Sequence, residues 1–385
     1  MIPYGRQWID EADIQAVIDT LRSDWLTQGP AVGKLEAAFA ELCRVPHAVA
    51  VNSATSALHI ACLAIGVGPG DVVWTVPNTF VASANCARLC GADVDFVDID
   101  PATYNISVAA LERKLRNAKA AGRLPKAVIP VHFSGRAPDQ EAIWSLAKDY
   151  GFRVIEDASH SVGATQGGEP VGSCRWSDIA VFSFHPVKII TTAEGGLATT
   201  RDPQLADRMS RLRTHGVTKD ERLLSRADEG GWYYEQIELG LNYRLTDMQA
   251  ALGLSQLRKL GQFLRRRREL VARYDRLLAD LPITRPLVDV LNESAWHLYV
   301  IRIDPQRAGK NRRQVYDSMR AGGVGVQVHY IPVHLQPYYR ALGFKPGHCP
   351  EAELYSEQAL SLPLYPAMSD AEQDQVIETL RTSLR

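Results

Sequence analysis

Short apolar runs alternate with amphipathic segments over the first two-thirds of the chain. The amphipathic segments place apolar residues at i, i+3, i+4 and i+7, as a helix with one buried face does. In the segment 34–43 these positions are Leu35, Ala38, Phe39 and Leu42. Such alternation is typical of an α/β domain with a mostly parallel sheet. The runs expected to form strands are "DVVWTV", "DVDFVDI", "AVIPVHF", "FRVIED", "IAVFSF" and "GGLATT".

The pattern changes after about residue 245. We expect a long helical stretch over 246–282, capped by Thr246 and interrupted near Gly261. A strand-like run at 296–303, a helix at 311–323, a second strand-like run at 324–333 and a closing helix from Asp370 follow it. Because 385 residues exceed what one core usually holds, two domains are expected: a large α/β domain over 1–250 and a small α+β domain over 251–385.

Charge and composition exclude several classes of protein. With 43 basic and 44 acidic residues the net charge is −1, which is not the basic footprint of a nucleic-acid-binding protein. No apolar run approaches the roughly 18 residues of a membrane span, and the N-terminus lacks a secretory signal pattern. The six cysteines form no CxxC pair, which favours scattered thiols in a reducing compartment over a zinc site. We expect a cytoplasmic protein without metal, nucleic acid or membrane partners.

Polar residues that can carry chemistry follow three of the expected strands. In "VNSATSALH", Thr55 and Ser56 begin a helix whose first turn either holds a phosphate or is simply capped by a hydroxyl. In "RVIEDASHS", a buried strand ends at Glu156 and Asp157, where an acidic residue serves a ligand or caps the next helix. In "SFHPVKIITTAEGG", Lys188 follows a buried strand, at a position where most lysines are only solvated.

These three segments are expected to meet in one crevice, because ligands of open α/β sheets bind at the carboxyl ends of the strands. Together they supply what pyridoxal phosphate needs. An amine, Lys188, forms a Schiff base with the aldehyde, and a carboxylate, Asp157, keeps the pyridinium nitrogen protonated. The helix start and the Ser183 hydroxyl hold the phosphate. Nucleotide-binding folds lack their fingerprint here, since neither GxxxxGK[ST] nor GxGxxG occurs.

Six blocks occur in an order that is specific to one family. They are "NSATSALH", "PNTFVASAN", "EDASHSVGA", "FSFHPVKIITTAEGG", "HGV" and "GLNYRLTDMQAALGLSQL". Over essentially the whole chain they resemble the nucleotide-sugar aminotransferases of the DegT/DnrJ/StrS type, which are fold type I enzymes that use pyridoxal phosphate. A branch of this family, the sugar dehydratases, has histidine where Lys188 stands, so the lysine argues for transamination.

The resemblance implies a role for each matching residue. Lys188 resembles the Schiff-base lysine, Asp157 the partner of the pyridine nitrogen, and His160 the neighbour of the ring hydroxyl. Phe80 resembles the aromatic residue that stacks on the ring, with a core phenylalanine as the alternative. The family also implies a homodimer with shared sites. The implied phosphate ligands are Thr55, Ser56, Ser183 and, from the second subunit, Asn242.

Two further segments, "SDWLTQGP" and "VQVHYIPVHLQPYY", resemble the transaminases of pseudaminic acid synthesis. Those enzymes make UDP-4-amino-4,6-dideoxy-N-acetyl-β-L-altrosamine, which implies L-glutamate as donor and a UDP-linked keto sugar as acceptor. Trp25 as a core anchor and His329 as a solvent-facing strand residue remain alternatives. The implied substrate residues are Tyr4, Trp25, Leu26, Thr27, Ala54, His329 and Tyr330.

Other functions stay open. One is amination of a different sugar, either a D-configured 4-keto sugar, as in the legionaminic acid, bacillosamine or perosamine pathways, or a 3-keto sugar. Another is a binding or regulatory protein that kept the fold without catalysis. The intact set of chemical residues argues against the second. That set is Lys188, Asp157, His160, Ser183 and Asn242.

Overall fold

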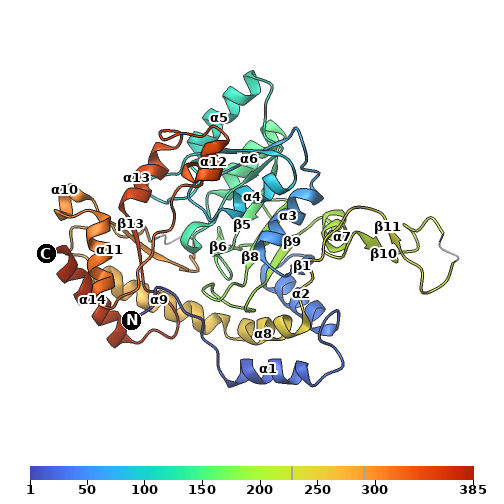
Figure 1. Cartoon of the computed structure of the whole chain (residues 1–385), viewed down its shortest axis with the longest axis horizontal. Coiled ribbons are helices and arrows are strands. Elements are labelled where there is room, and N and C mark those ends of the chain that lie inside the picture. Colours follow the sequence, from blue (N-terminus) through green and yellow to red (C-terminus); the bar gives the residue numbers. More distant parts are fainter. Residues whose placement is uncertain (227–228, 289–291) are drawn as a thin grey trace.

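A seven-stranded sheet forms the centre of the molecule (Figure 1). The structure is a computed structural model that describes residues 1–226, 229–288 and 292–385. The strand order is β1-β9-β8-β5-β4-β2-β3, in which only β9 runs antiparallel to its neighbours. The mostly parallel sheet predicted from the sequence is therefore confirmed. Its strands are β1 (His47–Val51), β2 (Val72–Thr75), β3 (Asp93–Phe96), β4 (Ala127–Ile129), β5 (Arg153–Asp157), β8 (Ile179–Ser183) and β9 (Gly196–Thr200).

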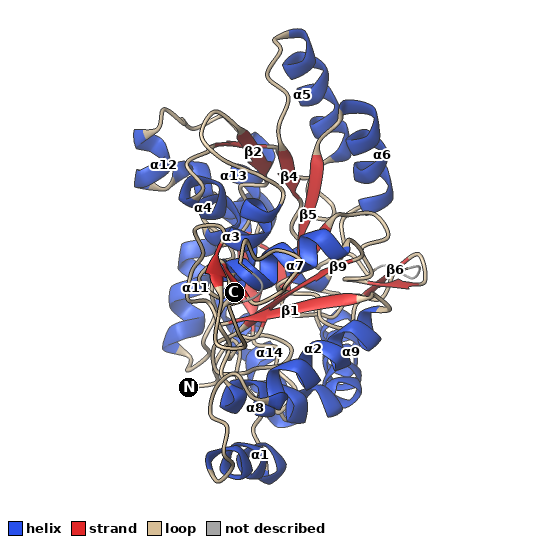
Figure 2. Cartoon of the chain, turned by 90° about the vertical axis from the view of Figure 1, so that its right-hand side faces the viewer, coloured by secondary structure: helices blue, strands red, loops and turns tan. Residues whose placement is uncertain are grey.

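Both faces of this sheet are buried, because successive side chains of a strand point to opposite sides. Val181 and Ala198 join a hydrophobic cluster with α3, α4 and α7. Their neighbours Phe182 and Leu197 join another cluster, with α2, α8 (Asp247–Arg258) and the start of α9 (Leu260–Leu277). Figure 2 shows these helices on either side of β1. The helices of this part are α1 (Glu11–Leu21), α2 (Pro30–Cys43), α3 (Ala54–Ala64), α4 (Ala82–Leu89), α5 (Val108–Ala120), α6 (Gln140–Tyr150) and α7 (Pro203–Leu212).

The C-terminal residues contribute to two cores. The antiparallel pair β12–β13 packs with the second half of α9, α11 and α14 around a core of its own. By contrast, Tyr339 of α12 and Tyr355 of α13 belong to the core of the main sheet. The domain boundary at residue 250 therefore stays a prediction. The elements are α8 (Asp247–Arg258), α9 (Leu260–Leu277), β12 (Tyr299–Arg302), α10 (Pro305–Ala308), α11 (Arg312–Ala321), α12 (Pro337–Ala341), α13 (Pro350–Gln358), β13 (Ala359–Leu362) and α14 (Asp370–Leu384).

In the C-terminal part the structure bears out one expectation and contradicts another. The long helical stretch is confirmed, with its break at Lys259, just before Gly261. The strand expected over 324–333 is wrong, because its backbone meets two different partners instead of one. Gly325 N–H donates to the Ile2 carbonyl, whereas Gln327 exchanges hydrogen bonds with Ser361. The segment therefore links the N-terminus to β13 without forming a ladder.

Two short hairpins of two strands each complete the described fold. β10 (Val217–Thr218) and β11 (Glu235–Gln236) form an arm that projects from the body (Figure 1). β6 (Thr165–Gln166) pairs with β7 (Glu169–Pro170). Within residues 1–226, 229–288 and 292–385, no helix combines the length and apolar content that crossing a bilayer requires.

The Thr246→Ala variant is expected to lose about 1 kcal/mol of unfolding free energy. Thr246 caps α8 as predicted: its hydroxyl accepts from the Gln249 N–H, and the Gln249 side chain accepts from the Thr246 N–H. Alanine removes this reciprocal pair. Urea unfolding measures the loss. Thr382→Ala, at an exposed position of α14, is the matched control and should leave the midpoint unchanged; an equal shift in both variants would contradict the capping role.

Candidate active site

A cavity of about 640 Å³ opens at the carboxyl ends of the parallel strands. It lies where open α/β sheets bind their ligands. Ten of the residues predicted from the sequence line it. They come from the carboxyl ends of β5 and β8 and the segments that follow β1, β2, β5 and β8, from the N-terminal segment, and from the segment between α11 and α12. They are Tyr4, Ala54, Thr55, Phe80, Asp157, His160, Ser183, Lys188, His329 and Tyr330.

Asp157 is a buried carboxylate whose two oxygens are held in place by three hydrogen bonds. Oδ2 accepts from the Ser83 hydroxyl at 2.6 Å. Oδ1 accepts from the Ser159 hydroxyl at 2.5 Å and from the Ser159 N–H at 3.2 Å. The residue is 5% exposed and begins no helix, so the capping alternative is wrong. The carboxylate is therefore fixed in orientation at the cavity wall.

Lys188 is the amine of the cavity. Its backbone follows β8 in a tight turn, where the Lys188 N–H donates to the His185 carbonyl. Burial lowers the pKa of its ammonium group to about 8, and the negative charge of Asp157 opposes that shift. In the described part of the chain its Nζ has no hydrogen-bond partner. The side chain is therefore more than a solvated charge, because a sizeable fraction of it is neutral near physiological pH.

Competitive acetylation of the protein without cofactor is expected to label Lys188 with a midpoint at about pH 8. Mass spectrometry of the Lys188 peptide measures it. The same lysine in the urea-unfolded chain is the control and should titrate near its ordinary pKa of 10.5. Between these two values the unfolded chain binds the extra proton, so this group makes the free energy of unfolding rise with pH across that window. Equal midpoints in folded and unfolded chains would contradict the desolvation.

The start of α3 offers hydroxyl and backbone donors to the same cavity. Ser53 caps the helix, and its Oγ accepts from the Ser56 N–H at 3.1 Å. Ser56 itself lies outside the lining, because its hydroxyl donates to Asn52 Oδ1 at 2.6 Å. Thr55 and Ser183 place hydroxyls in the cavity wall, beside a helix end whose partial charge favours an anion. This side of the cavity suits a phosphate.

Two imidazoles of the cavity, those of His329 and His160, have a lowered pKa. Burial, then the charge of Lys188, lowers the pKa of His329 to about 3. Burial is also the main cause that lowers the pKa of His160 well below its ordinary value. His329 is 7% exposed and its Nδ1 lies 2.8 Å from the Ser361 hydroxyl, so the solvent-facing alternative is wrong.

Besides Ser56, four predicted residues lie outside the cavity of this chain. Trp25, Leu26 and Thr27 follow α1, where Thr27 bridges to Thr246. Trp25 is 54% exposed, so it is not a core anchor. Asn242 is exposed on the loop before α8. That loop adjoins the phosphate side, since its Tyr243 carbonyl accepts from the Asn52 N–H at 2.9 Å.

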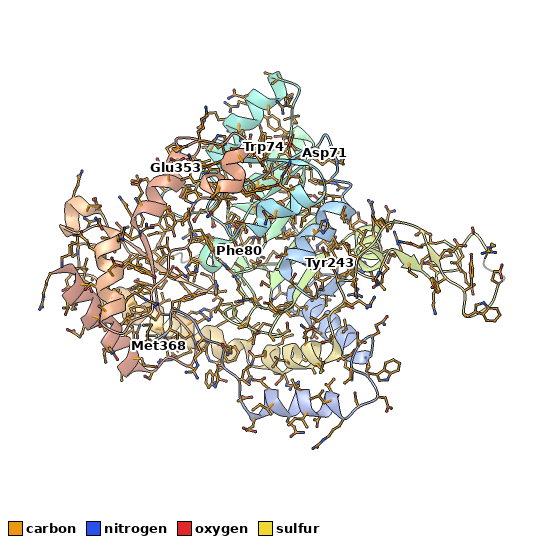
Figure 3. All side chains as sticks on the ribbon, in the orientation of Figure 1. Asp71, Trp74, Phe80, Tyr243, Glu353 and Met368 are labelled. Atoms are coloured by element: carbon orange, nitrogen blue, oxygen red, sulfur yellow. The ribbon has the colours of Figure 1, made fainter. Side chains whose placement is uncertain are left out.

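Figure 3 places Phe80 and Tyr243 in the middle band of the molecule, between the C-terminal part and the projecting arm. Phe80 is 61% exposed, so the alternative of a core phenylalanine is wrong. A flat, exposed aromatic side chain at a cavity wall can stack on a planar ligand. Its role as the stacking residue stays a prediction.

Sequence reasoning missed several residues of the site. Ser83 and Ser159 hold Asp157, and Glu194 and His297 line the cavity. Ser159 had a readable signal, because an aspartate commonly accepts a hydrogen bond from the backbone N–H two residues further on. Glu194 belongs to the segment "SFHPVKIITTAEGG", in which only Ser183 and Lys188 were predicted to be site residues. Ser83 and His297 had no such signal, since 74 and 137 residues separate them from Asp157 and His160.

The donor set fits pyridoxal phosphate. The cavity supplies one amine of lowered pKa, one oriented carboxylate, and hydroxyls beside a helix N-terminus. These match the aldehyde, the ring nitrogen and the phosphate of the cofactor. Within the described residues, no three side chains of His, Cys, Asp or Glu come together as a metal site requires.

Comparisons with known proteins agree with this chemistry. Residues 7–381 match the model of the DegT/DnrJ/EryC1/StrS aminotransferase family. The chain is 41% identical over 383 residues to the spore coat polysaccharide biosynthesis protein SpsC of Bacillus subtilis, covering 99% of this chain and 96% of SpsC. It is 38% identical over 385 residues to the uncharacterized protein MJ1066 of Methanocaldococcus jannaschii, covering 99% and 97%.

Solved structures extend the likeness to the fold. The sugar aminotransferase Spr1654 of Streptococcus pneumoniae, described as putative and in its PMP form, superposes with a TM-score of 0.90 at 32% identity, covering 100% of this chain and 99% of that one. PseC of Helicobacter pylori, an aminotransferase of pseudaminic acid biosynthesis, gives 0.90 at 30% identity with the same coverage. The chain therefore belongs to the DegT/DnrJ/EryC1/StrS aminotransferase family, as a sugar aminotransferase that uses pyridoxal phosphate.

Proposed function

We propose that the protein transfers the amino group of L-glutamate to C4 of a UDP-linked 4-keto-6-deoxy-N-acetyl hexose. The product is UDP-4-amino-4,6-dideoxy-N-acetyl-β-L-altrosamine, an intermediate of pseudaminic acid synthesis. The observation that carries the proposal is one cavity that joins Lys188 and Asp157 with Tyr4, His329 and Tyr330. The likeness to PseC supports the choice of sugar.

The cofactor, when bound, supplies an electron sink and a temporary carrier for the amino group. Lys188 acts as the general base and acid: its neutral amine removes the proton from the α-carbon of glutamate and later returns a proton. A pKa of about 8 suits this task, because both protonation states are populated near neutral pH. Asp157 holds a proton on the pyridine nitrogen, and its three hydrogen bonds keep the carboxylate aimed.

Glutamate and the sugar nucleotide use the same site in turn. Tyr4 lines the cavity from the N-terminal segment, and His329 and Tyr330 line it from the segment between α11 and α12. In this proposal the three contact the sugar. Thr55 and Ser183 hold the cofactor phosphate, and Phe80 covers the ring. The enzyme works in the cytoplasm.

A homodimer with shared sites completes the proposal. Trp25, Leu26 and Asn242 are exposed on this chain and lie outside its cavity. In a dimer, these residues and Thr27 would reach the site of the partner subunit, with Asn242 on the phosphate and the others on the sugar nucleotide. Sedimentation in solution tests the dimer.

A second candidate is amination of another keto sugar nucleotide. The sequence identities favour this candidate. The chain is 41% identical to SpsC, a protein of spore coat polysaccharide biosynthesis, but only 30% identical to PseC. Both candidates share Lys188 and Asp157, and they differ only in the sugar that the cavity accepts.

A half-reaction separates the two candidates. The protein loaded with pyridoxal phosphate is treated with L-glutamate, freed of excess donor, and then given either of two UDP-linked 4-keto-6-deoxy-N-acetyl sugars that are epimers at C5. Mass spectrometry detects the amino sugar. Amination of only the L-arabino epimer supports the proposed substrate. Amination of only the D-xylo epimer would support a sugar aminotransferase of a different pathway. If neither epimer is aminated, the proposal is contradicted.

A further inference from the structure

Ser134 adopts a backbone conformation that most residues avoid. It lies in the short turn after β4, with φ 62° and ψ 2°. This left-handed region is disfavoured for a residue with a Cβ, and it persists only where neighbours hold it. The Ser134 hydroxyl donates to the Leu298 carbonyl at 2.6 Å, and the Ser134 carbonyl accepts from the His297 N–H at 2.9 Å. The turn is thus clamped to the segment that leads into β12.

This clamp aims the Ser134 N–H at His160. The distance from the Ser134 nitrogen to His160 Nδ1 is 3.3 Å. A backbone N–H can only donate, so Nδ1 must be the unprotonated nitrogen of the ring. The proton of the neutral imidazole then lies on Nε2. Burial first, and then the nearby charge of Lys188, lower the pKa of His160, which agrees with a neutral ring.

The Nε2 side of the ring belongs to the cavity. His160 lines the cavity, and its Nε2 lies 3.4 Å from the Tyr330 hydroxyl. With the proton on Nε2, the ring offers an N–H donor there. The rings of Tyr330 and His160 are nearly parallel, at 23°, with their centroids 6.4 Å apart. The His160 Nε2–H and the Tyr330 hydroxyl can therefore both donate to one oxygen atom in the cavity.

His297 restrains the plane of the His160 ring. The centroids of the two imidazoles are 4.3 Å apart and tilted by 47°. His297 is 4% exposed, and its Nδ1 has no partner among the described residues. The backbone around His297 is held by Arg267. This arginine is buried, and its Nη1 donates to the carbonyls of Trp296, His297 and Leu364. The ring of His297 is consequently fixed against His160.

We propose that Ser134 and His297 are positioning residues that set the tautomer and the plane of His160. The Ser134 hydroxyl clamps the turn, its N–H occupies Nδ1, and the His297 ring fills one side of the imidazole. Nε2–H is thereby directed toward an anionic oxygen bound in the cavity. Under the proposed function this is the oxygen of the cofactor's ring hydroxyl. The tautomer itself does not depend on that function.

Nitrogen NMR of the protein without cofactor tests the tautomer directly. Histidine is labelled selectively with ¹⁵N, and long-range ¹H–¹⁵N correlations distinguish the two neutral forms and the cation. The His160→Asn variant identifies which signals belong to His160. We expect the Nε2–H form alone at about pH 7. The Nδ1–H form or the cation at that pH would overturn the proposal.

Ser134→Ala tests the clamp. Without the hydroxyl the left-handed turn loosens, and His160 is expected to populate both neutral forms. Ser161→Ala is the matched control, since Ser161 is the buried residue next to His160 and its hydroxyl has no partner in the part of the chain that is described. The control should retain Nε2–H alone. If Ser134→Ala does not fold, Ser134→Gly adopts the same turn without strain and also lacks the hydroxyl.

Turnover of the loaded protein gives a second readout. Ser134→Ala is expected to lose roughly tenfold in kcat, the size predicted for a weakened hydrogen bond to a charged group. A Ser134→Ala spectrum identical to that of the wild type overturns the clamp even if turnover falls. If the wild-type protein aminates neither test sugar, that result counts against the proposed function. It does not affect the tautomer, because the NMR result is obtained without cofactor or substrate.

Discussion

Turnover of the Lys188→Ala variant is expected to fall by at least about 10⁴-fold, the upper range for loss of a general acid–base group. Lys188 is the one amine of the described cavity lining, so no second amine can take over its proton transfer at the amino acid's α-carbon. The other contacts of the site remain, since Ser183, Thr55 and Asp157 are unchanged. The aminated sugar formed per unit time, measured by mass spectrometry, checks the expectation.

Lys119→Ala is the matched control. Lys119 is exposed near the end of α5 and lies outside the cavity, so its removal should change turnover and stability little. Equilibrium dialysis measures whether Lys188→Ala still binds pyridoxal phosphate. This separates loss of the chemistry from loss of the cofactor. If Lys188→Ala keeps near-normal turnover and the control is equally active, Lys188 is not the general acid–base group.

The Asp157→Asn variant is expected to lose about 10³-fold or more in turnover, comparable to losing a preorganised charged group of an active site. Asparagine keeps the shape of the side chain but carries no negative charge, so it cannot hold a proton on the pyridine nitrogen. The hydroxyls of Ser83 and Ser159, which donate to the carboxylate, would also meet a weaker acceptor. Single-turnover rates with glutamate measure the proton-removal step alone.

Asp149→Asn serves as the control for the loss of one negative charge. Asp149 is exposed on α6 and lies outside the cavity lining, so its rate should match the wild type. Unchanged single-turnover rates in Asp157→Asn would remove Asp157 from its role. Thermal unfolding of both variants checks that a slower rate does not come from partial unfolding.

The relation of Lys188 and Asp157 was readable from the sequence because both follow buried apolar runs. Each run forms a strand of the parallel part of the sheet, β8 or β5, and these two strands are neighbours in register. Carboxyl ends of parallel strands meet at one edge, so the two groups had to approach one another. The same rule brought Thr55 and Phe80 to the cavity from the ends of β1 and β2.

The sequence by itself thus determined the strand and helix pattern, the family and the groups that carry the chemistry, since these depend on local periodicity and on residues close along the chain. Only the tertiary structure decided which distant residues orient those groups. Ser83 reaches Asp157 from α4, and Ser134 and His297 reach His160 from two other loops. Burial, which exists only after packing, lowers the pKa values of Lys188, His160 and His329. Desolvation and long-range contacts leave no local pattern in a sequence, and for that reason the ionisation of this site could be read only from the folded chain.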